Sequence, residues 1–333
     1  MAAHQGASVQ AEAARMTMST RKEIRKSLST NFDPGPRHYA NRLMLRMRRA
    51  GHLPALWRGG ALDRPIFIIG APRSGTSILF SVLRSSSAVA HWPGEAHEVW
   101  EADHHPALLG WRSNELGVDD LDAGTADRIR REFFLVTGSR KRLIDKTPRN
   151  VLRVPFIDRI FPDARFVFLT RDGRDNVNSL INAWRSPRYR TYKLPKRHAI
   201  PGVDPEWWKF VLYPGWQDDT KGPLERVCAR QWVASNASVL DAEAASQPER
   251  WTRIRYEDLV DAPRAEVERV LRVLDLPPED AVLAKAEALD RTPINVVTPP
   301  EKGKWRRENP TEIGNVITLI APTMERLGYS IED

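Results

Sequence analysis

The sequence predicts an α/β domain with a mostly parallel sheet flanked by helices. Short apolar runs, typical of strands buried on both faces, occur at residues 65–69, 142–144, 164–170 and 251–254. The first and third run directly into polar loops that continue as helical patterns, which is the rhythm of βα units. The chain has 333 residues, 41% of them hydrophobic and 28% charged, so it can bury a large core.

The positive charge is confined to the start of the chain. Residues 1–60 hold 11 Lys and Arg against 3 Asp and Glu, whereas the rest holds 40 of each sign. We therefore expect a basic N-terminal arm over residues 1–63, partly disordered or helical, and one domain over residues 64–333. Since the body is neutral, the charge does not predict a nucleic-acid partner. A solvated arm, a transit peptide and a peripheral contact with an anionic membrane surface remain open for the arm.

Features that the sequence lacks limit which compartment and which chemistry we expect for the protein. Its apolar runs are too short to form a transmembrane segment, and no apolar signal region follows Met1. The single cysteine, Cys228, excludes an internal disulfide and lies in an apolar helical pattern over residues 224–240, where we expect it in the core. These features lead us to expect a cytoplasmic protein.

The loop after the first strand is patterned as an anion site. Its two glycines, Gly70 and Gly75, have the spacing of a P-loop, and backbone N–H groups converge where such a loop enters a helix. Thr76 stands where P-loop kinases carry lysine, and the cation lies earlier, at Arg73. This exchange argues against ATP γ-phosphate chemistry and favours a shorter, diester-like anion. The predicted anion ligands are Gly70, Arg73, Ser74, Gly75, Thr76 and Ser77.

A second anion site is predicted at the end of the strand at residues 164–170. Arg171 follows it directly, at the edge where open parallel sheets bind ligands. Ser179 lies about two helical turns further on and could share an anion with Arg171. The alternative is a salt-bridged helix start made by Asp172 and Asp175.

Together these motifs resemble those of the sulfotransferases that use 3′-phosphoadenosine 5′-phosphosulfate (PAPS). Residues 70–77 are similar to the family's 5′-phosphosulfate loop, and Arg171 with Ser179 matches its 3′-phosphate motif. Residues 255–259, which include Tyr256, match a recurrent R-Y-E-D-L segment. A late G-K-W loop that usually closes over the nucleotide is matched by Lys302, Gly303, Lys304 and Trp305.

The resemblance implies a P-loop-like fold, sulfuryl transfer from PAPS to an acceptor hydroxyl, and no metal. Because Arg73 stands where cytosolic aryl and steroid enzymes carry lysine, the chain looks closer to bacterial, Golgi-type carbohydrate and tyrosylprotein sulfotransferases. The K-x-x-H pattern of the aryl enzymes is also absent, which argues against phenol or steroid substrates. Carbohydrate, lipid, peptide and small-metabolite hydroxyls all remain open as acceptors.

Two residues are the candidates for catalysis. The resemblance implies that a lysine in a K-T-P segment, here Lys146, contacts the sulfate or its bridging oxygen, and that Glu95 is the base. Glu98 and His97 are the alternatives for the base, and a surface lysine paired with Asp145 is the alternative for Lys146. Enclosure by nearby tryptophans, Trp92 and Trp100, predicts a raised pKa for Glu95.

One insertion and two rival functions remain to be tested. Residues 185–222 interrupt the α/β rhythm with aromatic, basic and proline residues. They are either a packed insertion or an acceptor-binding lid. A P-loop kinase-like phosphotransferase and a non-catalytic nucleotide-binding protein are the alternative functions. Histidines and acids over residues 91–105 lack metal-ligand spacing, so no metal site is predicted.

Overall fold

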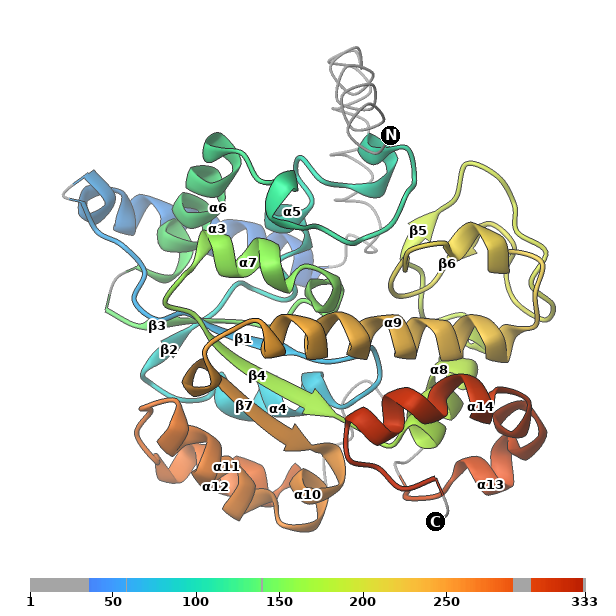
Figure 1. Ribbon diagram of the computed structural model, residues 1–333. Helices are drawn as coiled ribbons and strands as arrows, with labels where there is room; N and C mark the ends of the chain where they lie inside the picture. The colour runs from blue at the N-terminus through green and yellow to red at the C-terminus, as the bar shows by residue number, and fades with distance from the viewer. Residues whose placement is uncertain (1–35, 58, 139, 290–300, 332–333) are drawn as a thin grey trace.

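Five parallel strands form the central sheet, in the order β2-β3-β1-β4-β7 (Figure 1). The computed structural model describes residues 36–57, 59–138, 140–289 and 301–331. The strands of this sheet are β1 (Ile66–Ile69), β2 (Val89–Ala90), β3 (Arg142–Asp145), β4 (Arg165–Thr170) and β7 (Trp251–Arg255). The predicted α/β class with a mostly parallel sheet is therefore confirmed.

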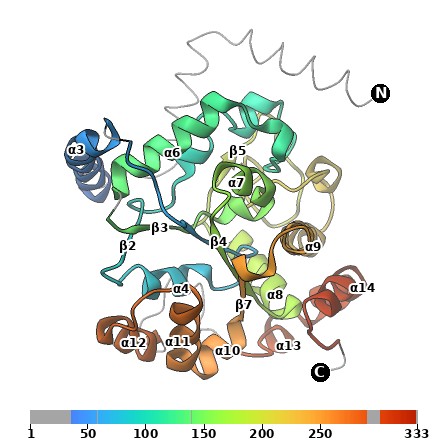
Figure 2. The same cartoon turned by 60° about the vertical axis from the view of Figure 1, so that its left-hand side comes forward.

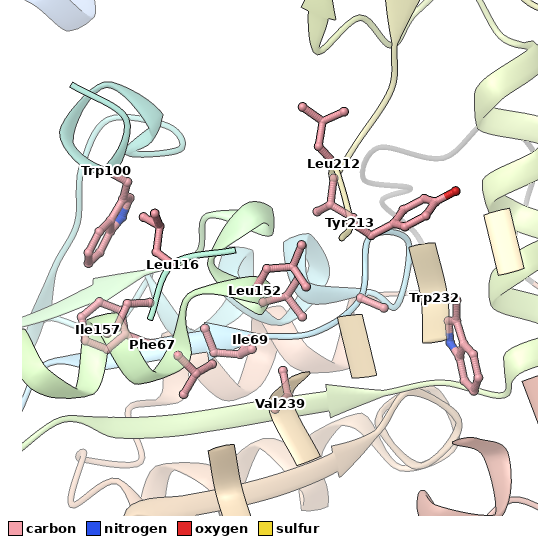
Figure 3. Packing of buried hydrophobic residues seen from close by; sticks show 14 of the residues in the cluster. Phe67, Ile69, Trp100, Leu116, Leu152, Ile157, Leu212, Tyr213, Trp232 and Val239 are labelled. Carbon is pink, nitrogen blue, oxygen red and sulfur yellow. The ribbon is translucent and has the colours of Figure 1, made fainter. Parts of the chain in front are cut away.

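The sequence of β1 explains why it is the central strand. All four residues are buried, and alternate side chains enter two different cores. Phe67 and Ile69 face one core, where Trp100 and Ile157 also lie (Figure 3). Ile66 and Ile68 face the other. A strand covered on both faces has no need of polar alternation, which is why its sequence is a continuous apolar run.

Helices cover both faces of the sheet (Figures 1 and 2). The core containing Ile66 is closed by α4 (Thr76–Leu83), α10 (Tyr256–Asp261), α11 (Pro263–Val273) and α12 (Asp280–Glu287). The larger core is closed by α6 (Ala123–Thr137), α7 (Val154–Ile160), α8 (Gly173–Arg185), α9 (Leu224–Ala244) and α14 (Pro310–Arg326). Cys228 of α9 is fully buried there, as predicted.

Several short elements complete the described chain. The short α-helices are α5 (His97–Trp100) and α13 (Trp305–Glu308). The 3₁₀ turns are η1 (Pro106–Leu109), η2 (Val118–Asp120), η3 (Pro148–Leu152), η4 (Trp216–Asp219) and η5 (Pro248–Arg250). Within the arm, α3 (Pro36–Trp57) forms a 22-residue helix, whereas the expectations for residues 1–35 lie outside the described residues.

The insertion over residues 185–222 packs its aromatic residues inward. It contains an antiparallel pair, β5 (Tyr192–Lys193) and β6 (Trp207–Trp208). Trp208 is fully buried and packs against Trp184 of α8 and Trp216. Most of these rings therefore belong to the larger core rather than to an open aromatic surface for an acceptor.

Candidate active site

The loop between β1 and α4 has the tight backbone of an anion cradle. Gly75, which precedes α4, has φ +103°, a conformation that favours glycine. A Cβ atom there would lie 2.5 Å from the ring of Tyr256, so this tyrosine packs directly on the loop. The loop thus presents its N–H groups at the start of a buried helix, where the helix dipole favours an anion. Tyr256, predicted from a separate motif, joins this site.

Arg73 extends from the loop toward the second predicted anion site. Its Nε donates to Ser179 Oγ at 3.3 Å, and a second guanidinium N–H donates to the Tyr189 hydroxyl at 3.0 Å. The guanidinium carbon lies 5.2 Å from the centroid of the Tyr189 ring. Burial lowers the pKa of Arg73 from its ordinary value. Although the sequence assigned Arg73 to the first site and Ser179 to the second, the two side chains are in contact.

Arg171 lies on the other side of the same loop. Its guanidinium donates to the Arg73 carbonyl at 3.1 Å and stacks over the Tyr256 ring at 4.4 Å. Its Nε is buried and has no hydrogen-bond partner among the described residues, and the same holds for Ser74 Oγ. Two buried polar groups without protein partners are what an anion-binding site presents before its ligand arrives.

The late G-K-W loop is fastened to α8 beside these groups. The Asp175 carboxylate accepts the Gly303 N–H at 2.8 Å and the Trp305 N–H at 3.4 Å. Arg174 lies over the Trp305 ring at 5.7 Å. The predicted nucleotide loop is therefore adjacent to Arg171.

The two lysines of this loop have different surroundings. Lys304 is buried and pairs at 3.2 Å with Glu308, whose carboxylate also accepts hydrogen bonds from Asn178 and Asn182 of α8. Lys302 is exposed and pairs with Asp261. Of the four predicted residues, Gly303 and Trp305 thus face α8 through their backbone, whereas the Lys302 side chain faces away.

Glu95, Lys146 and Ser77 meet at the other end of the loop. Lys146 is buried at the end of β3, and its Nζ donates to Glu95 Oε1 and, at 3.1 Å, to Ser77 Oγ. The second oxygen of Glu95 contacts His97 Nε2 at 2.9 Å. Both predicted catalytic residues therefore lie together beside the loop between β1 and α4.

The pKa of Glu95 moves opposite to the prediction. Burial raises it, but the Lys146 ammonium and the His97 ring outweigh burial and hold the pKa well below its ordinary range. The two tryptophans expected to enclose Glu95 pack into the larger core, Trp100 against Phe67 and Trp92 against Phe133. The indole N–H of Trp100 donates to Asp145. Glu95 is thus an ionised carboxylate in an ion pair.

The alternative bases lie less favourably. Glu98 is exposed on α5, and the structure gives it no contact with the loop. His97 keeps its Nε2 on Glu95, and burial and the nearby Arg149 lower its pKa below the ordinary 6.5. The geometry therefore favours Glu95 as the group that faces the loop.

The carboxylate of Asp145 supports this arrangement from inside the core. It accepts hydrogen bonds from Trp100, Asn150 and Thr147 at 3.1–3.2 Å, and burial raises its pKa to about 7. The Thr147 hydroxyl also accepts the Ala96 N–H at 3.1 Å, which ties the Glu95 segment to the end of β3. The alternative of a surface lysine paired with Asp145 is wrong, since Asp145 is buried and Lys146 pairs with Glu95.

Sequence reasoning also missed a sealed polar cluster close to the site. Glu101 is fully buried, pairs with Arg149 and with Arg153 at 2.8 Å, and accepts the Tyr192 hydroxyl at 2.8 Å. These cations outweigh burial, which alone would raise the pKa, and hold the pKa of Glu101 far below its ordinary range. The only sequence signal was the occurrence of charges in otherwise apolar segments.

These features define a P-loop-like α/β protein with a candidate anion site between two strand ends and with an ionised carboxylate and a lysine beside that site. The profile of the sulfotransferase family matches residues 65–280. The chain therefore belongs to the sulfotransferase family, and it is an enzyme of the transferase class.

Similar proteins agree with this assignment. Protein-tyrosine sulfotransferase A of Caenorhabditis elegans is 25% identical over 290 residues, which cover 79% of this chain and 67% of the relative. Protein-tyrosine sulfotransferase 1 of Danio rerio is 25% identical over 294 residues, 80% of this chain and 73% of the relative. The solved sulfotransferase STF9 of Mycobacterium avium has the same fold, with a TM-score of 0.58, 15% identity and coverage of 96% and 88%.

The expected cytoplasmic location is wrong. The finding that overturns it is the similarity to relatives named protein-tyrosine sulfotransferases. The expectation rested on a lone cysteine and on the absence of an apolar leader, and a protein that needs no disulfide can have both features in more than one compartment. In the part of the chain that the structure describes, no helix is long and apolar enough to cross a bilayer.

Proposed function

We propose that this enzyme transfers the sulfuryl group of PAPS to an acceptor hydroxyl, with Glu95 as the base. The observation that carries the proposal is the contact of Lys146 with both Glu95 and Ser77, because it joins a candidate base to the phosphate loop through one cation. Lys146 can thus stabilise charge on a departing phosphate while the neighbouring Glu95 accepts the proton of an attacking hydroxyl.

The 3′-phosphate end of the nucleotide is assigned to the groups around Arg73. Arg171 has an unpaired buried N–H, and Ser179 already accepts from Arg73, so an anion would find an Arg fork and a hydroxyl together. Tyr256 and Trp305 give this region flat apolar faces suited to an adenine ring. The residues fit a nucleotide with anionic groups at both ends.

The transfer step is assigned to the Glu95 end of the loop. PAPS supplies a sulfuryl group whose bond to a phosphate oxygen breaks as a bond from sulfur to the acceptor oxygen forms. Glu95 takes the proton of that hydroxyl, while Lys146 and the loop N–H groups stabilise the electron pair left on the phosphate oxygen. His97 holds the second carboxylate oxygen in place.

For the acceptor we propose a peptide tyrosine. Curated relatives that match most of the chain are named protein-tyrosine sulfotransferases. The absent K-x-x-H pattern argues against free phenols handled as aryl enzymes do, but a phenol presented by a peptide is compatible with a glutamate base. Carbohydrate, lipid and small-metabolite hydroxyls are the competing classes.

Transfer is tested by incubating the full chain with ³⁵S-labelled PAPS, EDTA and a tyrosine peptide flanked by acidic residues. We expect label on the peptide and none on its phenylalanine counterpart. Activity that requires Mg²⁺ and ATP instead would favour the phosphotransferase alternative. PAPS binding without transfer to any peptide, sugar or lipid acceptor would favour the non-catalytic alternative.

The assignment of the 3′-phosphate is tested by calorimetry. Adenosine 3′,5′-bisphosphate should bind more tightly than adenosine 5′-phosphate, and Arg171→Ala should reduce that difference by about 10- to 100-fold, the scale of a charge-assisted hydrogen bond. Equal affinity for the two nucleotides would overturn the assignment.

A further inference from the structure

The outer face of α3 carries an uninterrupted apolar stripe. Leu43, Met47, Ala50, Pro54 and Trp57 recur at spacings of four and three residues, so they lie along one side of the helix. All five are exposed, with Leu43 at 60%, Met47 at 68% and Trp57 at 78% of their full accessibility. Single exposed apolar residues are ordinary, but a continuous stripe marks an interaction surface.

The opposite face of α3 is firmly packed, so the stripe is not a helix that failed to dock. Leu45 is buried in the larger core, Arg49 pairs with Glu132 of α6, and His52 Nδ1 contacts the Leu135 carbonyl at 3.1 Å. Arg48 donates to the His91 carbonyl at 3.1 Å. These contacts fix the rotation of the helix and turn the stripe to the outside.

The charge of α3 indicates which kind of partner fits the apolar stripe. Its 22 residues include five arginines and no acidic residue. Arg48 and Arg49 contact the rest of the chain, whereas Arg46 is exposed between Leu43 and Met47. From residue 61 onward the chain holds equal numbers of acidic and basic residues, so this charge is local to the arm. A basic helix with an exposed apolar stripe matches an anionic, apolar interface.

A cleft continues the stripe at the end of α3. It encloses about 650 Å³ and is lined by apolar side chains that include Leu56, Trp57 and Phe134. Its charged lining is balanced, with Arg130 and Arg131 opposed by Asp127 and Asp163, and Arg130 pairs with Asp127 at 3.2 Å. The cleft therefore extends the apolar surface of the stripe without adding net charge to it.

We propose that the outer face of α3 binds the surface of an anionic phospholipid bilayer. A second copy of the chain is disfavoured, because two such helices would bring arginines together with no acidic residue to oppose them. Residues 1–35 are disfavoured as an intramolecular cover, since they hold five basic residues against three acidic ones. The proposal does not depend on the sulfuryl-transfer function.

The position of α3 keeps the Arg171 end of the candidate site away from the proposed bilayer. α3 lies at one edge of the molecule with α6, whereas α8, which follows the carboxyl end of β4, lies well away from it (Figures 1 and 2). The Glu95 segment lies nearer to α3, because Arg48 donates to the His91 carbonyl.

The test is cosedimentation of the full chain with lipid vesicles. We expect binding to phosphatidylcholine vesicles that contain roughly 30% phosphatidylserine, weak binding to pure phosphatidylcholine, and loss of binding between about 0.1 and 0.5 M salt. The double variant Leu43→Glu, Met47→Glu should weaken binding by at least about tenfold, and Arg46→Glu should weaken it by about tenfold.

The control replaces exposed valines elsewhere on the surface. Val260→Glu with Val273→Glu should leave vesicle binding unchanged, since these residues are 45% and 42% exposed but lie on α10 and α11. Far-UV circular dichroism and the urea unfolding midpoint report that each variant is folded. Equal binding to both vesicle types, unchanged binding of the Leu43→Glu, Met47→Glu variant, or a dimer that this variant abolishes in sedimentation velocity would each overturn the proposal.

Discussion

Two glutamates six residues apart, Glu95 and Glu101, carry the same chemistry in opposite surroundings. Each is an ionised carboxylate paired with basic side chains, and each has a pKa far below its ordinary range. Glu101 is sealed in the core, with its oxygens occupied by two arginines and a tyrosine. Glu95 is half-buried and pairs with a lysine that also reaches the phosphate loop.

The two glutamates differ in their access to solvent and ligand rather than in charge or in the direction of their pKa shift, and this difference is why we propose a catalytic role for Glu95 alone. Nothing can reach Glu101 without dismantling the core, so its charges hold η3 and the insertion in place. Lys146 can instead exchange Glu95 for an anion on the loop, because Ser77 already lies within hydrogen-bond reach. The depressed pKa that both carboxylates share does not by itself distinguish their roles.

The sharpest way to break the comparison is Glu95→Gln. We expect turnover to fall by about 10²–10⁴-fold, the usual contribution of a general base, with little change in nucleotide affinity by calorimetry. Glu98→Gln is the matched control, since it makes the same change three residues along on an exposed site. If both variants turned over like the wild type, Glu95 would not be the base.

Glu101→Gln should have the opposite consequence. Removing one charge of a buried cluster leaves two arginines uncompensated, so the free energy of unfolding in urea should fall by about 3–5 kcal/mol. Turnover per folded molecule should stay within a few-fold of the wild type. Tyr192→Phe, which keeps every charge, should cost less, about 1.5–3 kcal/mol. A stable but inactive Glu101→Gln enzyme would erase the distinction between the two glutamates.

The smallest expected effect is in the pH profile of kcat/KM. The pKa of Glu95 is depressed and that of His97 lies below 6.5, so neither gains a proton as the pH falls from 8 toward 6.5. Asp145, whose pKa burial raises to about 7, is the group beside the site that does gain a proton in this interval. We therefore expect at most a shallow acid limb near pH 7, which Asp145→Asn should remove. An acid limb at or above pH 6.5 that persists in Asp145→Asn would mean that a raised carboxylate or an ordinary histidine is the base, and the ion-pair description of Glu95 would fail.

The order of strands, loops and helices along the chain could be predicted from local patterns, but which charged side chains pair with one another could not. The strand ends carrying Lys146 and Arg171 were readable because buried strands are apolar and their loops are polar. The direction of the Glu95 pKa was missed because its partner lies 51 residues away in the sequence. Likewise the burial of Glu101 was invisible, since its cations come from another element and the local pattern resembles a solvated helix.

The contact of Arg73 with Ser179 illustrates the same limit. Each residue belonged to a recognisable motif, yet 106 positions separate them and only the sheet order brings their loops together. The aromatic composition of residues 185–222 could not separate a packed insertion from an acceptor-binding lid, because rings that suit a binding surface also suit a core. Most of these rings lie in the larger core. Tyr189, which reaches Arg73, is the member of that segment that joins the site.

Because β1 separates β3 from β4, Lys146 and Arg171 extend from strands that are two sheet spacings apart, about 10 Å. That interval is set by main-chain hydrogen bonds, so no side-chain substitution can lengthen or shorten it. The sheet therefore fixes the distance between the two ends of the proposed nucleotide site. Variation in the surrounding loops can change which acceptor is used without changing that distance.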